Sequence, residues 1–365
     1  MTTYLFAGGG TAGHVNPLLA TADRLVQRDP DATVLVLGTA EGLEARLVPE
    51  RGYELLTIPR LPFPRRPNGD VLRFPGRWRQ TVAQVRKILH DHHVDVVVGF
   101  GGYASAPAYR AARLEKLPIA LHEQNAKPGF ANRLGARWTR FVGTTFASTK
   151  LAHSTVVGLP LRYEIETLDL PPARSEGRAM FDLDHRMPTL LVTGGSTGAL
   201  RINESVSQSV AALLGSGWQI LHITGSRSPV ADPGLPGYHL IEYCDRMDLA
   251  LAVADLAISR AGAGTLAELA ALGIPAVLVP YAAGNGEQAY NAQDAVNAGG
   301  AILVTDEAFT PDYVRSELPA LLRNRALIAD MAARMVSVGV RDGADRMVDL
   351  VLAARDSAPV PGQVA

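Results

Sequence analysis

Residues 4–14 read YLFAGGGTAGH, and this stretch decides the fold of the first half of the chain. Tyr4–Ala7 is a short apolar run of the kind that forms a buried strand. The glycines that follow tolerate positive φ angles and suit a tight turn. Helical spacing of apolar positions then runs over Pro17–Gln27. A strand, a glycine turn and a helix in this order predict a parallel sheet covered by helices.

The same unit recurs along the chain. Further strand-like runs lie at Thr33–Leu37, Val94–Val98, Ile119–His122, Arg140–Val142, Pro188–Thr193, Gln219–Ile223, Leu256–Ser259 and Pro275–Val279. Helical patterns lie at Ala104–Lys116, Ala199–Leu214, Thr265–Leu272 and Glu287–Ala298. We therefore predict an α/β fold with two doubly wound, Rossmann-like domains, each with helices on both faces of a parallel sheet.

The predicted domains are residues 1–161 and 162–340, with a polar joint at Arg162–His185. A ligand is expected between them, at the carboxyl ends of the strands. We expect residues 341–355 to form a helix that packs back on the first domain. The last ten residues, 356–365, contain two prolines and no helical pattern, so we expect a disordered tail.

Composition excludes several classes of protein. Of the 365 residues, 47% are hydrophobic and 19% are charged, which is typical of a folded globular chain rather than a disordered one. Cys244 is the one cysteine, so no internal disulfide is expected, and the first twenty residues do not read as a signal peptide. The longest apolar run, about residues 270–284, is too short and too interrupted to span a bilayer. These features predict a cytosolic protein that does not cross the membrane.

Charge is distributed unevenly between the two halves. Residues 1–160 hold 20 basic and 12 acidic side chains, a balance of +8, whereas the rest hold 15 and 24, a balance of −9. The first half is therefore expected to meet an anionic partner.

The most basic segment is residues 60–87, which contain a single acid, Asp70. Its basic residues are Arg60, Arg65, Arg66, Arg73, Arg77, Arg79, Arg86 and Lys87, interleaved with Leu61, Phe63, Leu72, Phe74 and Trp78. We predict that this segment attaches the protein peripherally to the cytoplasmic face of the cell membrane. The alternative is a basic loop followed by a helix whose apolar residues face the core.

Four glycine-rich turns follow predicted strands, at residues 8–13, 99–102, 194–198 and 262–265. Each precedes a helix, whose free N–H groups and positive dipole end can receive an anion. The alternative is a tight strand-to-helix turn without a ligand. The first turn also fits the dinucleotide fingerprint G-x-G-x-x-G, but Gly38-Thr39-Ala40 stands where that fold needs an acid. The chain has no P-loop motif.

Polar residues near these turns are candidates for chemistry. His14 is our candidate general base, with a locally satisfied cap as the alternative. His122-Glu123-Gln124-Asn125 places four polar side chains at a strand end, where we expect them to be difficult to bury, and Glu123 is the reserve base. Glu268 either forms a capping box with Thr265 or accepts both hydroxyls of a ribose. The D-x-D spellings at 29–31 and 182–184 indicate polar turns, so we expect no metal and no cofactor.

Together these segments resemble the MurG glycosyltransferases over most of the chain, from Tyr4 to about residue 350. The motifs that carry the resemblance are residues 8–14 with Pro17, 38–40, 99–103, 122–125, 158–162, 194–203, 260–268 and 286–291. The resemblance implies the two-domain glycosyltransferase B fold. It also implies an inverting transfer of N-acetylglucosamine from UDP-N-acetylglucosamine to the muramyl 4-hydroxyl of lipid I, the undecaprenyl-pyrophosphoryl-MurNAc-pentapeptide, which makes lipid II for peptidoglycan synthesis.

The resemblance further implies roles for single residues. Residues that match positions facing the sugar nucleotide in the first domain are Thr11, Ala12, Gly13 and Asn125, and those near its phosphates and uridine are Arg162 and Ser196. Residues that match the turn and helix start under the pyrophosphate and uridine are Ala263, Gly264, Thr265, Leu266 and Ala267. Glu268 matches the ribose carboxylate, Gln288 the residue that holds the sugar hydroxyls, and Cys244 a backbone contact to uracil. Three positions depart from the family pattern: Ala12 replaces a frequent Gly, Thr197 a common Gln, and Glu287 a second Gln that contacts the sugar in some members.

Two other functions remain open from the sequence. A UDP-N-acetylglucosamine 2-epimerase shares this architecture but needs no lipid acceptor, so residues 60–87 would serve no purpose there. A non-catalytic subunit that binds a sugar nucleotide is the second alternative. The partners implied by the favoured interpretation are UDP-N-acetylglucosamine, lipid I, an anionic membrane surface and other cell-wall synthesis proteins, with no nucleic acid.

Overall fold

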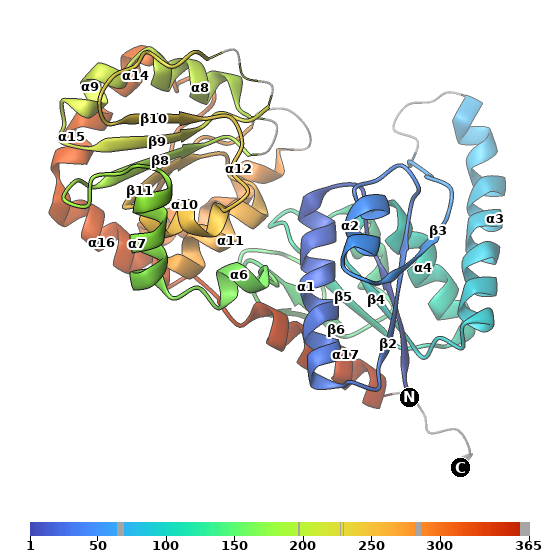
Figure 1. Cartoon of the computed structure of the whole chain (residues 1–365). Helices are drawn as coiled ribbons and strands as arrows, with labels where there is room; N and C mark the ends of the chain where they lie inside the picture. Colours follow the sequence, from blue (N-terminus) through green and yellow to red (C-terminus); the bar gives the residue numbers. More distant parts are fainter. Residues whose placement is uncertain (64–68, 196–197, 227, 229, 282–285, 358–365) are drawn as a thin grey trace. The chain divides into compact units, whose positions relative to one another are not determined.

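The computed structural model describes residues 1–63, 69–195, 198–226, 228, 230–281 and 286–357. The chain divides into two compact units. Unit 1 contains residues 1–162 and the chain from Asp342 onward, and unit 2 contains residues 163–341. Each unit is built on one parallel sheet, and Figure 1 labels the strands and helices.

The sheet of unit 1 has seven strands in the order β3-β2-β1-β4-β5-β6-β7. Its strands are β1 Thr3–Ala7, β2 Thr33–Gly38, β3 Glu54–Thr57, β4 Val96–Gly99, β5 Ile119–Glu123, β6 Phe141–Thr144 and β7 Ser154–Val156. The strand order reverses between β1 and β4, where parallel sheets commonly bind ligands. The sequence analysis missed β3 and β7 because these short edge strands expose polar residues and lack a continuous apolar run.

Helices cover both faces of this sheet. They are α1 Ala12–Arg28, α2 Glu44–Glu50, α3 Gly69–Asp91, α4 Gly102–Glu115, α5 Phe130–Gly135 and α17 Gly343–Asp356. Side chains of β1 alternate between the faces: Tyr4 and Phe6 pack with α1 and α17, whereas Leu5 packs with α3 and α4. This alternation confirms the predicted doubly wound fold for unit 1.

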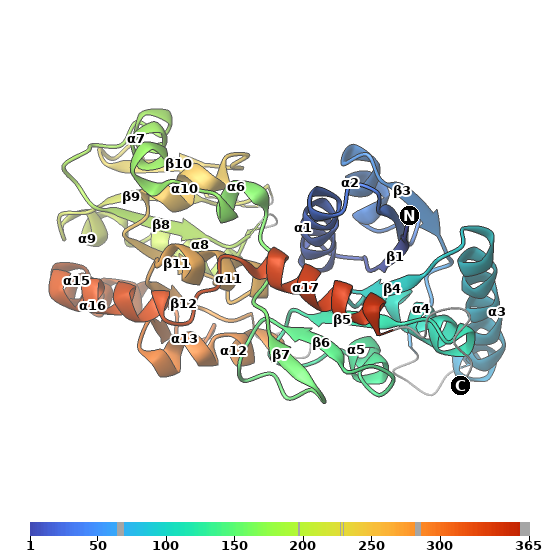
Figure 2. The same ribbon diagram turned by 90° about the horizontal axis from the view of Figure 1, so that it is seen from below.

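The last helix, α17, lies beside α1, β5 and β6 (Figure 2). Arg28 of α1 forms an ion pair with Asp349 at 2.7 Å, and Arg24 forms one with Asp345. Met347 and Val351 of α17 are fully buried in the same core as α1. The helix ends at Asp356, one residue later than predicted, and the predicted tail from residue 358 lies outside the described residues.

Unit 2 contains a six-stranded parallel sheet in the order β10-β9-β8-β11-β12-β13. Its strands are β8 Thr189–Thr193, β9 Gln219–Ile223, β10 Tyr238–Ile241, β11 Leu256–Ser259, β12 Ala276–Leu278 and β13 Ala301–Leu303. Its helices are α6 Tyr163–Glu166, α7 Leu170–Met180, α8 Leu200–Ser207, α9 Val210–Leu214, α10 Met247–Val253, α11 Ala263–Leu272, α12 Glu287–Asn291, α13 Gln293–Ala298, α14 Pro311–Ser316, α15 Leu318–Arg323 and α16 Arg325–Val336. The helices predicted at Ala199–Leu214 and Glu287–Ala298 are each two shorter helices.

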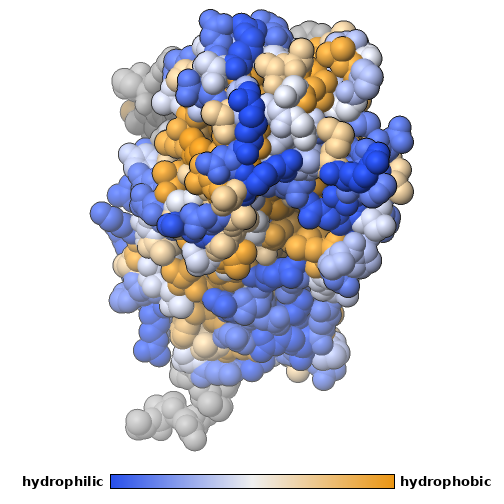
Figure 3. Space-filling model, turned by 90° about the vertical axis from the view of Figure 1, so that its left-hand side faces the viewer, coloured by the Kyte–Doolittle hydropathy of each residue, from blue (hydrophilic) through white to orange (hydrophobic). Residues whose placement is uncertain are grey.

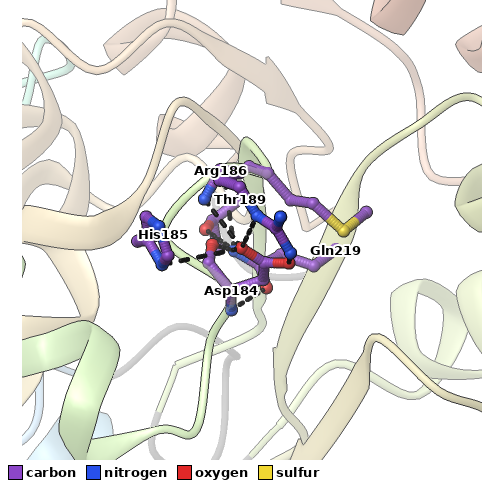
Figure 4. A network of polar contacts seen from close by, with 6 residues as sticks. Asp184, His185, Arg186, Thr189 and Gln219 are labelled. Atoms are coloured by element: carbon purple, nitrogen blue, oxygen red, sulfur yellow. Dashed lines mark hydrogen bonds and ion pairs between the residues drawn. The ribbon is translucent and has the colours of Figure 1, made fainter.

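The stretch Arg162–His185, predicted as a polar joint, is largely folded. It contains α6 and α7, and Ala173 of α7 packs against Leu249 and Ala252 near α10. The turn that follows α7 is held by the buried side chain of Gln219 (Figure 4). Gln219 accepts the backbone N–H of Asp184 at 2.8 Å and donates to the hydroxyl of Thr189 at 3.0 Å.

The D-x-D spelling at 182–184 belongs to this turn. The carboxylate of Asp184 accepts hydrogen bonds from the backbone and the guanidinium of Arg186, which holds the pKa of Asp184 below its usual value. Asp184 is thus used locally, as the polar-turn interpretation predicts.

Seen from the left-hand side of Figure 1, the surface is mostly hydrophilic, with apolar residues in separate areas between (Figure 3). Scattered exposed apolar residues are usual on protein surfaces and do not by themselves mark an interface. In the part of the chain that the structure describes, no helix is both long enough and apolar enough to span a bilayer.

Candidate active site

The first glycine turn places His14 in the first turn of α1. Thr11 is the N-cap residue of this helix, and its hydroxyl lies 2.9 Å from Nδ1 of His14. Burial lowers the pKa of His14 to about 4, although the carboxylate of Glu44 opposes this shift. His14 is therefore neutral at pH 7 and able to accept a proton, as a weaker base than an ordinary histidine.

A carboxylate of the protein itself fills the first glycine turn. Oε2 of Glu44 accepts the N–H of Gly10 at 2.7 Å, and Oε1 accepts the N–H and the hydroxyl of Thr39 at 2.9 and 2.8 Å. For this turn the contacts agree with the alternative of a tight strand-to-helix turn without a bound anion. A dinucleotide diphosphate at Gly10 would have to displace Glu44 and meet its negative charge.

The second glycine turn packs directly on the first. Gly102 has a φ of +79°, and a Cβ atom there would collide with the carbonyl oxygen of Gly9. Gly101 lies against the imidazole of His14, because an added Cβ would lie 3.0 Å from its Cδ2 atom. Both residues must therefore be glycine for the two turns to approach this closely.

The cluster at 122–125 is buried, contrary to the sequence-based expectation. His122, Glu123 and Gln124 are all at most 3% exposed, and Asn125 is half-buried. Oε1 of Glu123 accepts the N–H of Asn125 at 2.9 Å. Oε2 accepts the N–H of Gly129 at 2.9 Å and the side-chain amide of Asn132 at 3.0 Å.

These donors give Glu123 a structural task. Burial raises the pKa of Glu123, and the hydrogen bonds only partly offset this effect. Both carboxylate oxygens hold the loop that follows β5, so this arrangement favours His14 over Glu123 as the base. His122 likewise serves the structure, since its Nε2 lies 2.8 Å from the carbonyl oxygen of Gly158.

Unit 2 contains a cavity of about 890 Å³. Its lining comes from the turn after β8, the start of α8, the ends of β11 and β12, and α12. The lining residues are Thr193, Gly194, Gly195, Gly198, Ala199, Leu200, Arg201, Asn203, Glu204, Ser228, Arg260, Gly262, Thr265, Tyr281, Gln288 and Asp306. The volume lies within the range of small-molecule sites, and most of these residues follow the carboxyl ends of parallel strands.

Arg260 is the best-anchored cation of this cavity. It forms an ion pair with Asp306, and Nη1 donates to the carbonyl oxygen of Val279 at 3.0 Å. The ring of Tyr281 lies 5.4 Å from the guanidinium carbon. These contacts hold a mostly buried positive charge at the wall of the cavity.

A buried polar network supports another part of the lining. Asn203 donates to the carbonyl oxygen of Thr224 at 2.8 Å and to the hydroxyl of Ser228 at 3.0 Å. Its Oδ1 atom lies 3.1 Å from Nε2 of His222, whose Nδ1 lies 2.8 Å from the hydroxyl of Tyr238. Because Asn203 offers an acceptor here, His222 carries its proton on Nε2 and accepts from Tyr238.

The cavity includes only some of the predicted donor residues. Thr265 and Gln288 line it, and Oε1 of Gln288 accepts the backbone N–H of Tyr281 at 2.9 Å. The others do not belong to its lining: Cys244, Ala263, Gly264, Leu266, Ala267, Glu268 and Glu287. Arg162 belongs to unit 1, and Ser196 and Thr197 lie outside the described residues.

The capping-box alternative for Glu268 is wrong. Helix α11 begins at Ala263 with Gly262 as its N-cap, so Thr265 lies inside the helix rather than at the cap. Glu268 is half-buried on α11, one turn beyond Thr265. Leu266 is almost fully buried in the core, so any ligand contact there would involve its backbone.

Family comparisons agree with this geometry. Residues 4–144 match the N-terminal domain of glycosyltransferase family 28, and residues 189–347 match its C-terminal domain. A protein of Leifsonia xyli subsp. xyli named UDP-N-acetylglucosamine--N-acetylmuramyl-(pentapeptide) pyrophosphoryl-undecaprenol N-acetylglucosamine transferase is 60% identical over 351 residues, which cover 96% of this chain and 98% of that protein. The crystal structure of Acinetobacter baumannii MurG is 28% identical with a TM-score of 0.81, covering 97% of this chain and 100% of that one. The chain belongs to the MurG group of glycosyltransferase family 28.

Membership of the MurG group confirms the predicted resemblance and the glycosyltransferase B fold. A UDP-N-acetylglucosamine 2-epimerase of Neisseria meningitidis is 16% identical with a TM-score of 0.67, covering 97% of this chain and 100% of that one. At this identity the likeness shows a shared fold alone.

Sequence reasoning did not select four residues that organise this MurG-group site. Arg260 lies inside a motif quoted for the resemblance, so the motif was the available signal. Asn203 likewise ends the quoted motif 194–203. Asp306 and Glu44 act through partners 46 and 34 residues away, for which no local pattern exists. Among the residues that the structure describes, no three His, Cys, Asp or Glu side chains gather as a metal site would require.

Proposed function

We propose that this enzyme transfers N-acetylglucosamine from UDP-N-acetylglucosamine to the muramyl 4-hydroxyl of lipid I and so makes lipid II. The observation that carries the proposal is the 60% identity, over nearly the whole chain, to a relative named for this reaction. The family match to both halves of the chain supports a glycosyltransferase, and the relatives' names do not favour the epimerase alternative.

The donor binds in the cavity of unit 2. A glycine turn and the N-terminus of α11 offer backbone N–H groups to the diphosphate, and Arg260 adds a fixed positive charge. Gln288 serves the sugar hydroxyls, and Glu268 on α11 accepts the ribose hydroxyls. Departure of UDP is then stabilised by dipoles and charge that are already oriented before the reaction.

The base is His14 of unit 1. A neutral imidazole takes the proton of the muramyl 4-hydroxyl while its oxygen bonds to the anomeric carbon on the face opposite UDP. The bond between that carbon and the phosphate oxygen of UDP breaks, and UDP leaves. Thr11 orients the imidazole through its 2.9 Å contact with Nδ1, and Gly101 leaves room beside it.

Unit 1 also attaches the enzyme to an anionic membrane surface. Phe63 of residues 60–87 contacts Phe74 and Phe130 with ring centroids 5.2 and 4.8 Å apart, and Phe63 and Phe130 are 53% and 56% exposed. Leu72 is 87% exposed, contrary to the alternative of a helix with its apolar residues in the core. Leu61 is buried and Trp78 packs against the core, as that alternative predicts. We call Phe63, Leu72, Phe74 and Phe130 the apolar patch.

Exposed arginines lie on the same helix as Leu72 and Phe74. Arg73, Arg77 and Arg79 are exposed on α3, and within the described chain none of them forms an ion pair. Basic residues near an anionic bilayer contribute about 1 kcal/mol each, and exposed apolar side chains add shallow insertion. Arg65 and Arg66 lie outside the described residues.

The deciding experiment measures UDP release with UDP-N-acetylglucosamine and a short-chain lipid I analogue. Release that depends on the acceptor and yields the disaccharide supports the transferase. Release of UDP without an acceptor, or formation of an epimerised sugar, would support the epimerase instead. Donor binding without any turnover would support the non-catalytic subunit.

A further inference from the structure

Glu44 is an acidic residue that is almost fully buried, which is rare for a carboxylate. It is the first residue of α2 and only 1% exposed, and its carboxylate lies inside the first glycine turn. A Cβ atom on Gly9, Gly38 or Gly42 would collide with the Glu44 side chain. Three glycines from two separate turns thus leave the space that this one carboxylate occupies.

Both oxygens of the Glu44 carboxylate accept hydrogen bonds. The N–H of Gly10 and both polar groups of Thr39 donate to it over 2.7–2.9 Å, and Thr39 itself is 3% exposed. Burial raises the pKa of Glu44, but these hydrogen bonds outweigh burial and hold the pKa below its usual value. Glu44 is therefore a charged, hydrogen-bonded group at neutral pH.

Gly10, which contacts Glu44, is only four residues before the candidate base His14 in the chain. Gly10 has a φ of +92° and precedes Thr11, which caps α1 and holds Nδ1 of His14. Gly9, on the other side of the turn, packs against Gly102 of the second glycine turn. A movement of Gly10 would shift both the start of α1 and the wall beside His14.

We propose that Glu44 is a positioning residue, which fixes the first glycine turn from within and thereby sets the placement of Thr11 and His14 for proton transfer. This inference rests on the proposed function, in which His14 is the base. Glu44 contacts no reacting atom; it acts through Gly10. The turn thus uses an internal anion where the related dinucleotide fold binds a diphosphate.

The test compares Glu44→Gln with Glu50→Gln, which removes the same charge from an exposed position on the same helix. The amide of Glu44→Gln cannot accept from all three donors, so the turn loosens. We expect kcat to fall on the order of 10- to 100-fold, because small misplacements of catalytic groups have effects of this size. The Kd for UDP should stay within twofold, since no residue of the first glycine turn lines the cavity of unit 2. The signal of the Gly10 amide proton should move upfield in Glu44→Gln and stay in place in Glu50→Gln.

Four outcomes would count against the proposal in different ways. A wild-type kcat in Glu44→Gln overturns the positioning role, and an equal loss of kcat and UDP binding shows a general folding defect instead. If Glu44→Gln does not fold, Thr39→Val, which removes a single hydroxyl donor, decides: a several-fold loss of kcat supports the proposal, and an unchanged kcat overturns it. If the wild-type enzyme shows no acceptor-dependent UDP release, the proposed function itself is wrong. This failure is distinguishable from failure of the Glu44 proposal because it is seen without any variant.

Discussion

The hydroxyl of Thr11 lies 2.9 Å from Nδ1 of His14, so one edge of the imidazole is held by the N-cap residue of its own helix. This contact leaves Nε2 as the ring nitrogen next to Gly101. A base must be oriented as well as neutral, and the N-cap of α1 supplies the orientation.

Replacing His14 by Ala is expected to lower kcat by about 10²–10⁴-fold, the usual effect of losing a general base. The Kd for UDP should remain at the wild-type value, as isothermal titration calorimetry can measure. In the wild type, kcat should fall only as the pH drops through about 4, because the protonated imidazole cannot accept a proton. Near-normal turnover of His14→Ala together with inactivity of Glu123→Gln would transfer the role to Glu123.

Glu268→Ala is expected to raise the KM for UDP-N-acetylglucosamine, because the ribose hydroxyls would lose their acceptor. A buried hydroxyl without a partner costs about 1–3 kcal/mol, which corresponds to a rise of roughly 5- to 150-fold. Glu204→Gln, in the lining of the unit 2 cavity, is the control for loss of one negative charge in that unit. An unchanged KM in Glu268→Ala would remove Glu268 from the donor site.

Changing Arg73, Arg77 and Arg79 to Glu should release the enzyme from anionic vesicles. Turnover of a soluble acceptor analogue should remain close to that of the wild type, because these side chains are exposed and unpaired within the described chain. Sedimentation with vesicles at several salt concentrations checks this, since screening weakens the attraction. Equal binding of wild type and variant to anionic and neutral vesicles would contradict the membrane proposal.

Gly102→Ala should destabilise unit 1 more than Gly52→Ala. Both glycines have a φ near +80°, but an added Cβ meets the carbonyl of Gly9 only at position 102, while position 52 is open. The conformational strain of about 1–2 kcal/mol is therefore common to both, and the collision is extra for Gly102. Urea unfolding measures the difference, and equal losses of stability would show that the two glycine turns do not pack as closely as described.

Stability should decrease as the pH falls from about 6.5 to about 4. Burial lowers the pKa of His14, His122 and His222 to about 4, whereas these residues titrate near 6.5 in the unfolded chain. Between these values the unfolded state binds more protons, so the free energy of unfolding rises with pH in this window. His222→Gln should flatten the pH dependence, and His185→Gln, at an exposed position, should not. A pH dependence that is the same in both variants would contradict this assignment.

The sequence by itself determined the architecture and the family. Apolar runs followed by glycine turns and helical patterns predicted two doubly wound sheets, because burial on both faces leaves short continuous apolar stretches such as Val96–Val98. A local pattern also marked His14, since it directly follows the first glycine turn, whereas the role of Gln288 was implied by the resemblance to the MurG family. Edge strands such as Ser154–Val156 were missed because exposure removes the apolar signal.

Only the tertiary structure decided which polar residues are buried and what they hold. The sequence suggested Glu123 as the reserve base but not the loop that it holds: its carboxylate is buried because the loop after β5 brings Gly129 and Asn132 to it. Arg260 meets Asp306 across 46 residues, and Glu44 meets Gly10 across 34. Such contacts depend on which strands become neighbours in the sheet, and no local spacing records that. Whether a buried charge stabilises the fold depends on hydrogen-bond partners that are distant in the chain. The sequence could therefore identify the glycine turns but not the carboxylate of Glu44 inside the first of them.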